Sequence, residues 1–230
     1  MSQQTPIEKG DAIHLGRPVT VDRYRAGARL NHWVTALSLI LLALSGLAMF
    51  HPSLFFLSAI FGGGQNTRAF HPWIGVVLFF SFLLLFLQFW RANLWNRSDV
   101  EWLAHAKDLV RGHEEKMPEV GKYNAGQKFI FWSMTILILV LIVSGIVIWD
   151  EYFFTLTGVE TKRFAVLIHA MAAVIIICVW ILHVYAAIWV RGSMQAMVKG
   201  SVSGGWAWRH HRKWLKQLAA KPINKGGPAA

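Results

Sequence analysis

Four histidines lie in, or at the edge of, long apolar stretches, where a polar side chain is costly unless it has a ligand or a partner. They are His32, His71, His169 and His183. His169 and His183 share one stretch and are 14 positions apart, which on a helix is a rise of about 21 Å and about 40° short of four full turns. One helix therefore presents two imidazoles, at two depths, to the same neighbours. Such imidazoles can bind a metal centre; each one alone could equally be a neutral ring hydrogen-bonded to an adjacent helix.

The elements that must position these histidines are four stretches that are long and apolar enough to cross a membrane. They cover about 33–50, 72–90, 129–149 and 164–190. The composition agrees, because 55% of the 230 residues are hydrophobic and only 15% are charged. We therefore predict an all-α fold, an integral membrane four-helix bundle with interfacial amphipathic helices. It forms a single domain over 1–230, with flexible tails at 1–20 and 216–230.

The distribution of Lys and Arg predicts the orientation of the chain. Five precede the first stretch, seven lie in the 91–128 loop and eight follow the last stretch, whereas the 51–70 and 150–163 loops hold one and two. The basic loops remain on the cytoplasmic side, so both termini are expected there. The net charge of +11 is explained by the membrane lipid surface and needs no nucleic acid.

Successive spans run in opposite directions, and this groups the histidines by depth. His71 and His169 fall at the outer level, whereas His32 and His183 fall at the inner level. Two imidazoles from two helices at one level are typical of a haem whose axial positions are both filled. A zinc ion would need further ligands, and the one cysteine, Cys178, is expected to be a packing residue. His51 is a weaker alternative to His71 at the outer level.

Other residues are assigned more ordinary roles. We expect five histidines to be solvated surface residues: His14, His105, His113, His210 and His211. The segments 99–110 and 205–218 combine apolar residues at helical spacing with charge, and we expect both to lie on the membrane surface. Three glycines within the spans let helices or a flat macrocycle approach closely, or serve ordinary helix packing: Gly46, Gly75 and Gly145.

Five short motifs give the chain a family resemblance. In order they are ARLNHW (28–33), HPWIG (71–75), GKYNAGQK (121–128), VLIHA (166–170) and ILHVYAAIWVRGS (181–193). Together they resemble the cytochrome b (gamma) subunit of respiratory membrane-bound formate dehydrogenase, over about residues 20–215. The histidines alone would also suit the cytochrome b of nickel–iron hydrogenase or thiosulfate reductase, and the Asn-Ala-Gly-Gln run narrows the choice. A non-redox membrane anchor or a histidine-relay transporter remains an alternative from another class.

The resemblance implies a multi-pass subunit of the bacterial inner membrane that carries two b haems. His71 and His169 would hold the outer haem iron, and His32 and His183 the inner one. Its partners would be an iron–sulfur (beta) subunit and, through it, a molybdopterin-containing catalytic (alpha) subunit, with a higher oligomer of this heterotrimer possible. Electrons would arrive on the periplasmic side and reach menaquinone or ubiquinone near the cytoplasmic side. No residue of this chain resembles a formate-oxidising site.

The resemblance also implies a quinone site at Asn124, Gly126 and Gln127, beside the inner haem. Neutral amide donors stabilise the negative charge that develops on a quinone oxygen during reduction, and they cost less at a bilayer edge than Lys or Arg. The alternative is that Asn124 caps the helix that follows.

Overall fold

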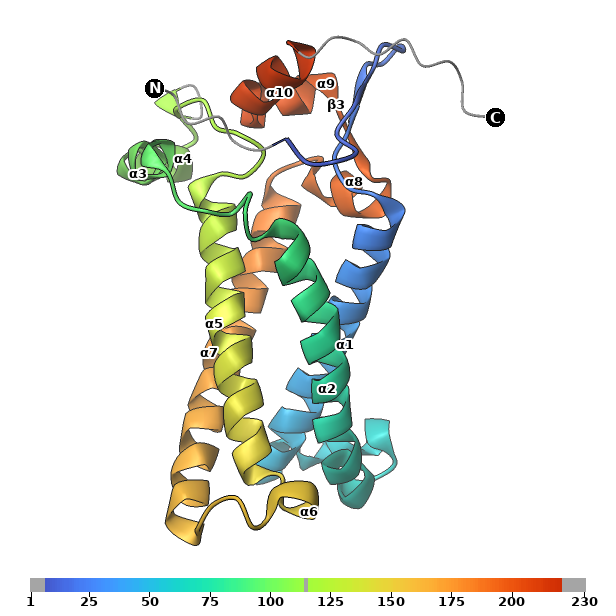
Figure 1. Ribbon diagram of the computed structural model, residues 1–230, viewed down its shortest axis with the longest axis vertical. Helices are drawn as coiled ribbons and strands as arrows, with labels where there is room; N and C mark the ends of the chain where they lie inside the picture. The colour runs from blue at the N-terminus through green and yellow to red at the C-terminus, as the bar shows by residue number, and fades with distance from the viewer. Residues whose placement is uncertain (1–6, 114–115, 221–230) are drawn as a thin grey trace. The chain divides into compact units, whose positions relative to one another are not determined.

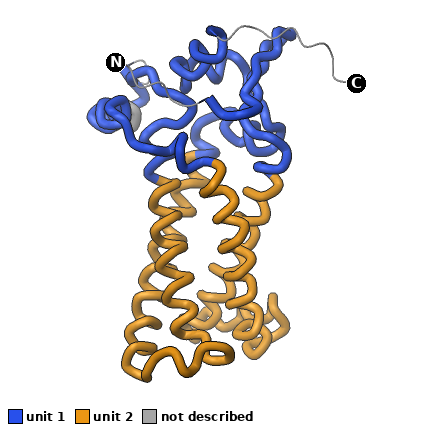
Figure 2. The backbone as a smooth tube through the Cα atoms, viewed as in Figure 1, with its two compact units in different colours: residues 1–29, 89–129, 187–230 blue, residues 30–88, 130–186 orange. Residues whose placement is uncertain are grey.

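The structure is a computed structural model that describes residues 7–113 and 116–220. Its chain forms two compact units (Figure 2). Unit 1 comprises Met1–Arg29, Phe89–Phe129 and Ala187–Ala230, and unit 2 comprises Leu30–Gln88 and Ile130–Ala186.

Unit 2 holds most of four long helices, which run side by side as a bundle (Figure 1). They are α1 (Ala26–Phe50), α2 (Gly64–Phe89), α5 (Ala125–Ile148) and α7 (Val159–Trp189). One buried aliphatic residue from each helix belongs to a common core: Leu39, Leu78, Ile138 and Ile176. All four helices are long and apolar enough to span a membrane, so the predicted fold class is confirmed.

Each of these helices begins four to eight residues before the apolar stretch predicted from the sequence. The length of an apolar stretch corresponds to the thickness of the hydrocarbon layer. The helix itself begins earlier, because its first turn can lie in the interface, where its polar groups remain hydrated. Pro72 consequently lies inside α2, although the apolar stretch predicted from the sequence begins at this residue. The missing N–H of Pro72 leaves the carbonyl of Arg68 without its usual helical donor.

Two short helices connect the spans within unit 2. The 3₁₀ helix η1 (Pro52–Phe61) precedes α2, and α6 (Asp150–Phe153) precedes α7. The turn after η1 uses Gly62 and Gly63, with φ of 82° and 104°, a conformation that favours glycine. The side chains of Phe55, Phe56 and Ile60 on η1 are exposed, which suits contact with lipid.

Unit 1 contains a small antiparallel sheet that the sequence analysis did not predict. Its strands are β1 (Ile13–His14), β2 (Thr20–Asp22) and β3 (Ser201–Ser203), in the order β1-β2-β3 with Val21 opposite Val202. β1 and the first residue of β2 fall within the tail expected at 1–20. Strands of two or three residues are too short to show the alternation that identifies a strand in a sequence.

Five short helices also belong to the described residues of unit 1. They are α3 (Arg97–Ala104), α4 (Ala106–Val110), α8 (Ser193–Val198), α9 (Gly204–His210) and α10 (Arg212–Ala219). The end of α10 covers residues 216–219 of the segment expected as a flexible tail at 216–230. Residues 1–6 and 221–230 of the two expected tails lie outside the described residues.

The two segments expected on the membrane surface behave differently. Trp214 and Leu218 of α10 are buried in the core of unit 1, beside Val21 and Val202. The expectation was therefore wrong for this face of 205–218, because an amphipathic pattern does not say which apolar surface will cover it. The segment 99–110 is divided at His105, and Val100 and Leu103 are exposed on α3, as a membrane-surface helix requires.

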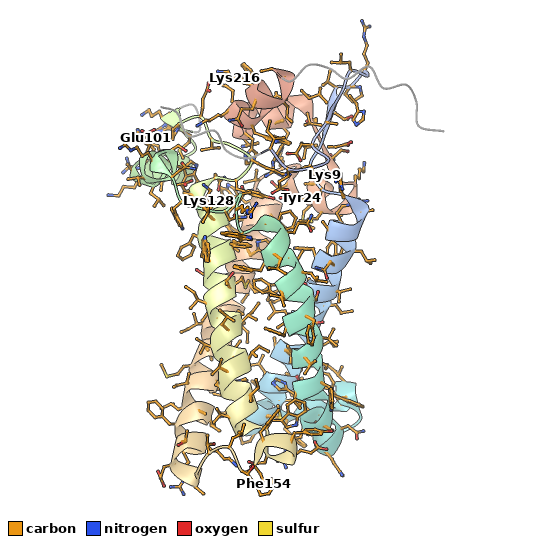
Figure 3. The ribbon with its side chains drawn as sticks, viewed as in Figure 1. Lys9, Tyr24, Glu101, Lys128, Phe154 and Lys216 are labelled. Carbon is orange, nitrogen blue, oxygen red and sulfur yellow. The ribbon has the colours of Figure 1, made fainter. Side chains whose placement is uncertain are left out.

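Two buried lysines fix the chain on either side of the beginning of α5. The Lys122 ammonium lies 2.7 Å from the Glu8 carboxylate and 2.6 Å from that of Asp11. The Lys128 ammonium lies 2.7 Å from the Asp99 carboxylate, and both side chains are 1% exposed. Figure 3 shows Lys128 at the first turn of α5. Since a buried charge is tolerated only with a partner, these contacts determine how the segment 122–128 is held.

Burial also controls protonation in unit 1. It raises the pKa of the Glu8 carboxyl, although the Lys122 cation opposes this, and it raises the pKa of Tyr123 well above its usual value. His211 is 1% exposed, and its Nδ1 donates to the carbonyl of Gly121 at 2.8 Å. Burial, and then the cation of Arg23, lower the pKa of His211 well below its usual value. Our expectation that His211 is solvated was therefore wrong.

Replacing Lys122 by Met should destabilise unit 1 strongly, because two carboxylates would lose their buried cation. The free energy of unfolding should fall by about 3–5 kcal/mol, measured by pulse proteolysis of the protein in detergent across a urea series. Lys162→Met is the matched control, because Lys162 pairs with the exposed Asp150, and an exposed pair contributes about 0–1 kcal/mol. Equal losses in the two variants would contradict this assignment.

Candidate functional site

The outer histidine pair consists of His71 on α2 and His169 on α7. Their ring centroids are 6.2 Å apart. Each Nδ1 atom faces a serine hydroxyl from a different helix: Ser45 Oγ of α1 lies 2.7 Å from His71 Nδ1, and Ser144 Oγ of α5 lies 2.9 Å from His169 Nδ1. All four helices of the bundle therefore contribute to this pair.

The inner pair consists of His32 on α1 and His183 on α7, with ring centroids 6.3 Å apart. His32 Nδ1 is buried and has no hydrogen-bond partner among the described residues. His32 also meets the ring of Trp33 edge-on, with centroids 5.6 Å apart. The two pairs thus have nearly the same separation but different surroundings.

These separations fit two imidazoles on opposite sides of one iron atom. An imidazole nitrogen binds a metal at about 2 Å and the ring centroid lies about 1.1 Å farther away, so two axial rings have centroids about 6 Å apart. Within 7–113 and 116–220, no three His, Cys, Asp or Glu side chains gather in one place. Each pair offers two ligands, which suits a macrocycle that supplies the remaining four.

Two of the three expected glycines lie against the outer pair. A Cβ at Gly46 would be 3.6 Å from His71 Cε1, and one at Gly145 would be 3.5 Å from His169 Cε1. Gly75 has no atom within 4 Å of such a Cβ. A Cβ at either position would be in ordinary van der Waals contact with the ring, so Gly46 and Gly145 lie directly beside the two imidazoles.

The sequence analysis missed Ser45 and Ser144. A signal was present, because each serine directly precedes one of these glycines, in LSGLA (44–48) and VSGIV (143–147). A Ser-Gly pair repeated on two spans, each close to the depth of a histidine, would have indicated these contacts.

Three further histidines within the described chain have partners of their own. His51 accepts the backbone N–H of Ser53 at 3.2 Å and caps η1, which accounts for its position without a ligand role. The exposed His14 and His105 contact Asp22 and the carbonyl of Glu101. We expected Cys178 to be a packing residue. Its side chain is instead exposed on α7.

The polar segment before α5 forms a reciprocal helix cap. The backbone N–H of Gln127 donates to Asn124 Oδ1 at 2.9 Å, and the backbone N–H of Asn124 donates to Gln127 Oε1 at 3.0 Å. This is a capping box, as expected from the alternative interpretation. The cap uses the amide oxygens, so the NH₂ donors of both side chains are not consumed by it.

The space at Gly126 has an aromatic wall. A Cβ at this position would lie 3.3 Å from the ring of Trp102 on α3. A larger residue at this position would require the Trp102 ring to move by a few tenths of an ångström. The ring of Trp102 therefore lies directly against the beginning of α5.

A bundle of four membrane-spanning helices with two facing histidine pairs defines a class, the membrane cytochromes b. Residues 23–200 match the family model of prokaryotic cytochrome b561, and the chain belongs to this family.

Curated relatives cover almost the whole chain. The cytochrome b556(fdo) subunit of formate dehydrogenase from Escherichia coli K12 is 42% identical over 204 residues, which is 89% of this chain and 96% of that protein. The cytochrome b556(Fdn) subunit of its nitrate-inducible formate dehydrogenase is 39% identical over 197 residues, covering 86% and 91%. The formate dehydrogenase cytochrome b556 subunit of Haemophilus influenzae is 33% identical over 205 residues, covering 89% and 86%. The resemblance predicted from the sequence is confirmed.

Proposed function

We propose that this chain is the membrane subunit through which a formate dehydrogenase complex passes electrons to quinone. The observation that carries the proposal is the presence of two histidine pairs, at centroid separations of 6.2 and 6.3 Å. The names of its relatives support formate as the source of the electrons. The proposed partners are an iron–sulfur subunit and a molybdopterin-containing catalytic subunit outside the cytoplasm.

In this proposal His71 and His169 hold the outer haem b, and His32 and His183 hold the inner one. Each haem, when bound, supplies a site that accepts and releases one electron without binding oxygen, because both axial positions are closed. The helices of the chain hold the two sites at different depths of the bundle. Leu39, Leu78, Ile138 and Ile176 pack together in the bundle core and exclude water from it.

The amide groups of Asn124 and Gln127 are proposed to bind the quinone on the cytoplasmic side. Quinone takes up two electrons, supplied by formate oxidation in the catalytic partner, and two protons from the cytoplasm to become quinol. The capping box holds both side chains in one orientation, which favours stabilisation of the developing negative charge by preset NH₂ donors. Capping and quinone binding are thus compatible roles of one residue pair.

Replacing one histidine should remove one haem and leave the other. His169→Ala should lose the outer haem and His183→Ala the inner one, each lowering the haem content from two to one per chain, measured by the pyridine haemochrome spectrum. His51→Ala is the control, because His51 only caps η1. Two haems in folded His169→Ala protein would remove His169 as a ligand, and equal loss of both would contradict separate sites.

A variant that keeps the cap but removes the amide donors separates the two roles at Asn124. Serine is a good N-cap residue, so Asn124→Ser should leave stability and haem content unchanged. Quinone reduction should fall roughly a hundredfold, since loss of one such donor costs about 3 kcal/mol of barrier. The measurement is the rate at which added quinone reoxidises the formate-reduced complex.

The matched control is Asn96→Ser, because Asn96 forms the same capping box at α3 with Asp99. Gln127→Glu keeps the acceptor oxygen of the cap and removes the second donor. If Asn124→Ser and Gln127→Glu are both reoxidised at the wild-type rate, the quinone binds elsewhere.

The proposed direction of electron flow requires both termini in the cytoplasm. Alkaline phosphatase fused after residue 60 or 157 should be active, and fusions after residue 113 or 220 should be inactive. The basic loops predict this pattern, because they resist translocation. Active fusions after residue 220 would place the inner pair on the wrong side and overturn the proposed direction.

A further inference from the structure

Two serines on different helices contact the two histidines of the outer pair in the same way. Ser45 on α1 and Ser144 on α5 each place Oγ within 2.9 Å of an imidazole Nδ1. Each is followed by a glycine whose Cβ position lies 3.5 or 3.6 Å from Cε1 of the same ring. The hydroxyl therefore contacts one ring nitrogen, while the glycine lies beside the neighbouring ring carbon.

The hydrogen-bond partners of the serines determine where the protons lie. Ser45 Oγ is 2.8 Å from the carbonyl of Leu41, and Ser144 Oγ is 2.6 Å from that of Val140. A hydroxyl has one proton, and a carbonyl can only accept, so each serine donates to its own helix. The same oxygen then accepts the Nδ1–H of the histidine. Each ring is thereby held as the tautomer whose Nε2 carries a free lone pair.

We propose that Ser45 and Ser144 are positioning residues that fix the outer histidines for iron ligation and lower the reduction potential of the outer haem. This inference rests on the proposed haem ligation. An acceptor at the second ring nitrogen raises the basicity of an imidazole ligand. A more basic ligand stabilises ferric iron over ferrous iron, and hydrogen bonding to ligands is one of the means by which a protein tunes its haem.

In the inner pair, the histidine on α1 has no serine hydroxyl beside its Nδ1 atom. His32 Nδ1 is buried without a hydrogen-bond partner among the described residues. The outer site therefore has two serine acceptors, whereas His32 has none of this kind. This difference lowers the outer potential relative to the inner one, so it favours electron transfer from the outer level to the inner level.

The test is a redox titration of the purified complex carrying Ser45→Ala, Ser144→Ala or both, followed by the haem absorption bands. The outer haem is identified as the one lost in His169→Ala. Removing a supporting hydrogen bond typically weakens metal binding at least tenfold; a tenfold loss that falls on the ferric form alone raises a one-electron potential by about 59 mV. We expect the outer potential to rise by about this amount in each single variant, while the inner potential stays unchanged and two haems remain bound.

The matched control is Thr135→Val on α5. Thr135 is buried, and its hydroxyl donates to the carbonyl of Phe131 at 2.8 Å, so this variant removes the same kind of helix contact away from the histidines. Ser144→Thr keeps the hydroxyl and should keep the potential near that of the wild type. Loss of the outer haem alone in an alanine variant, with two haems retained in Thr135→Val, would also support positioning.

An unchanged outer potential in the double alanine variant, or an equal shift in Thr135→Val, would overturn the inference. Its failure is distinguishable from failure of the proposed function. Two bound haems with an unshifted outer potential contradict the serine role alone. A wild-type complex without two haems, or His169→Ala protein that keeps both, contradicts the ligand assignment itself.

Discussion

Within a bilayer, every polar group must find its partner inside the protein, and the arrangement of unit 2 depends on this constraint. Imidazoles, hydroxyls and the carbonyl left without a donor by Pro72 are among the polar groups that its spans bring into an apolar setting. The serines and Thr135 donate to carbonyls of their own helices, four residues back. Such hydroxyls add no unsatisfied donor to the core. The serines beside the outer pair then accept from histidines on neighbouring helices, so one small side chain satisfies polar groups on two helices.

The same constraint acts differently in unit 1, where cations are buried. Lys122 and Lys128 lie on either side of the capping box of Asn124 and Gln127, and each has a buried carboxylate partner. Lys128 also donates to the carbonyl of Leu94 at 2.9 Å. The segment that carries the proposed quinone donors is therefore tied to the chain near residue 10 and to the beginning of α3. An electrostatic site gains most from hydrogen-bond donors that need not reorganise, and the three ion pairs of the two buried lysines provide such rigidity.

The spans and their directions, which the membrane imposes, could be predicted from the sequence. Most contacts between individual side chains, which depend on how the helices pack, were not predicted. Apolar length and the positions of Lys and Arg indicated four spans, and opposite directions of the spans grouped the histidines that the structure brings together. Ser45 and Ser144 were missed because the hydroxyl of a serine in a span usually donates to a carbonyl of its own helix and needs no partner on another helix. His211 was misassigned because its neighbours Arg212 and Lys213 suggested an exposed surface, while its ring is covered by Trp206 and Trp214.

The asymmetry between the two histidine pairs has an energetic reason in the proposed direction of flow. Moving one electron across a membrane towards the negative side costs about 2.3 kcal/mol per 100 mV of potential. In the proposed direction this cost is met by the overall fall in redox energy from formate to quinone, and an outer site that is the stronger reductant would supply part of that fall between the two pairs. Geometry alone cannot provide the difference, because the ring separations of the two pairs are nearly identical. The atoms behind the ligands can provide it, and it is there that the serine-bonded rings of His71 and His169 differ from that of His32.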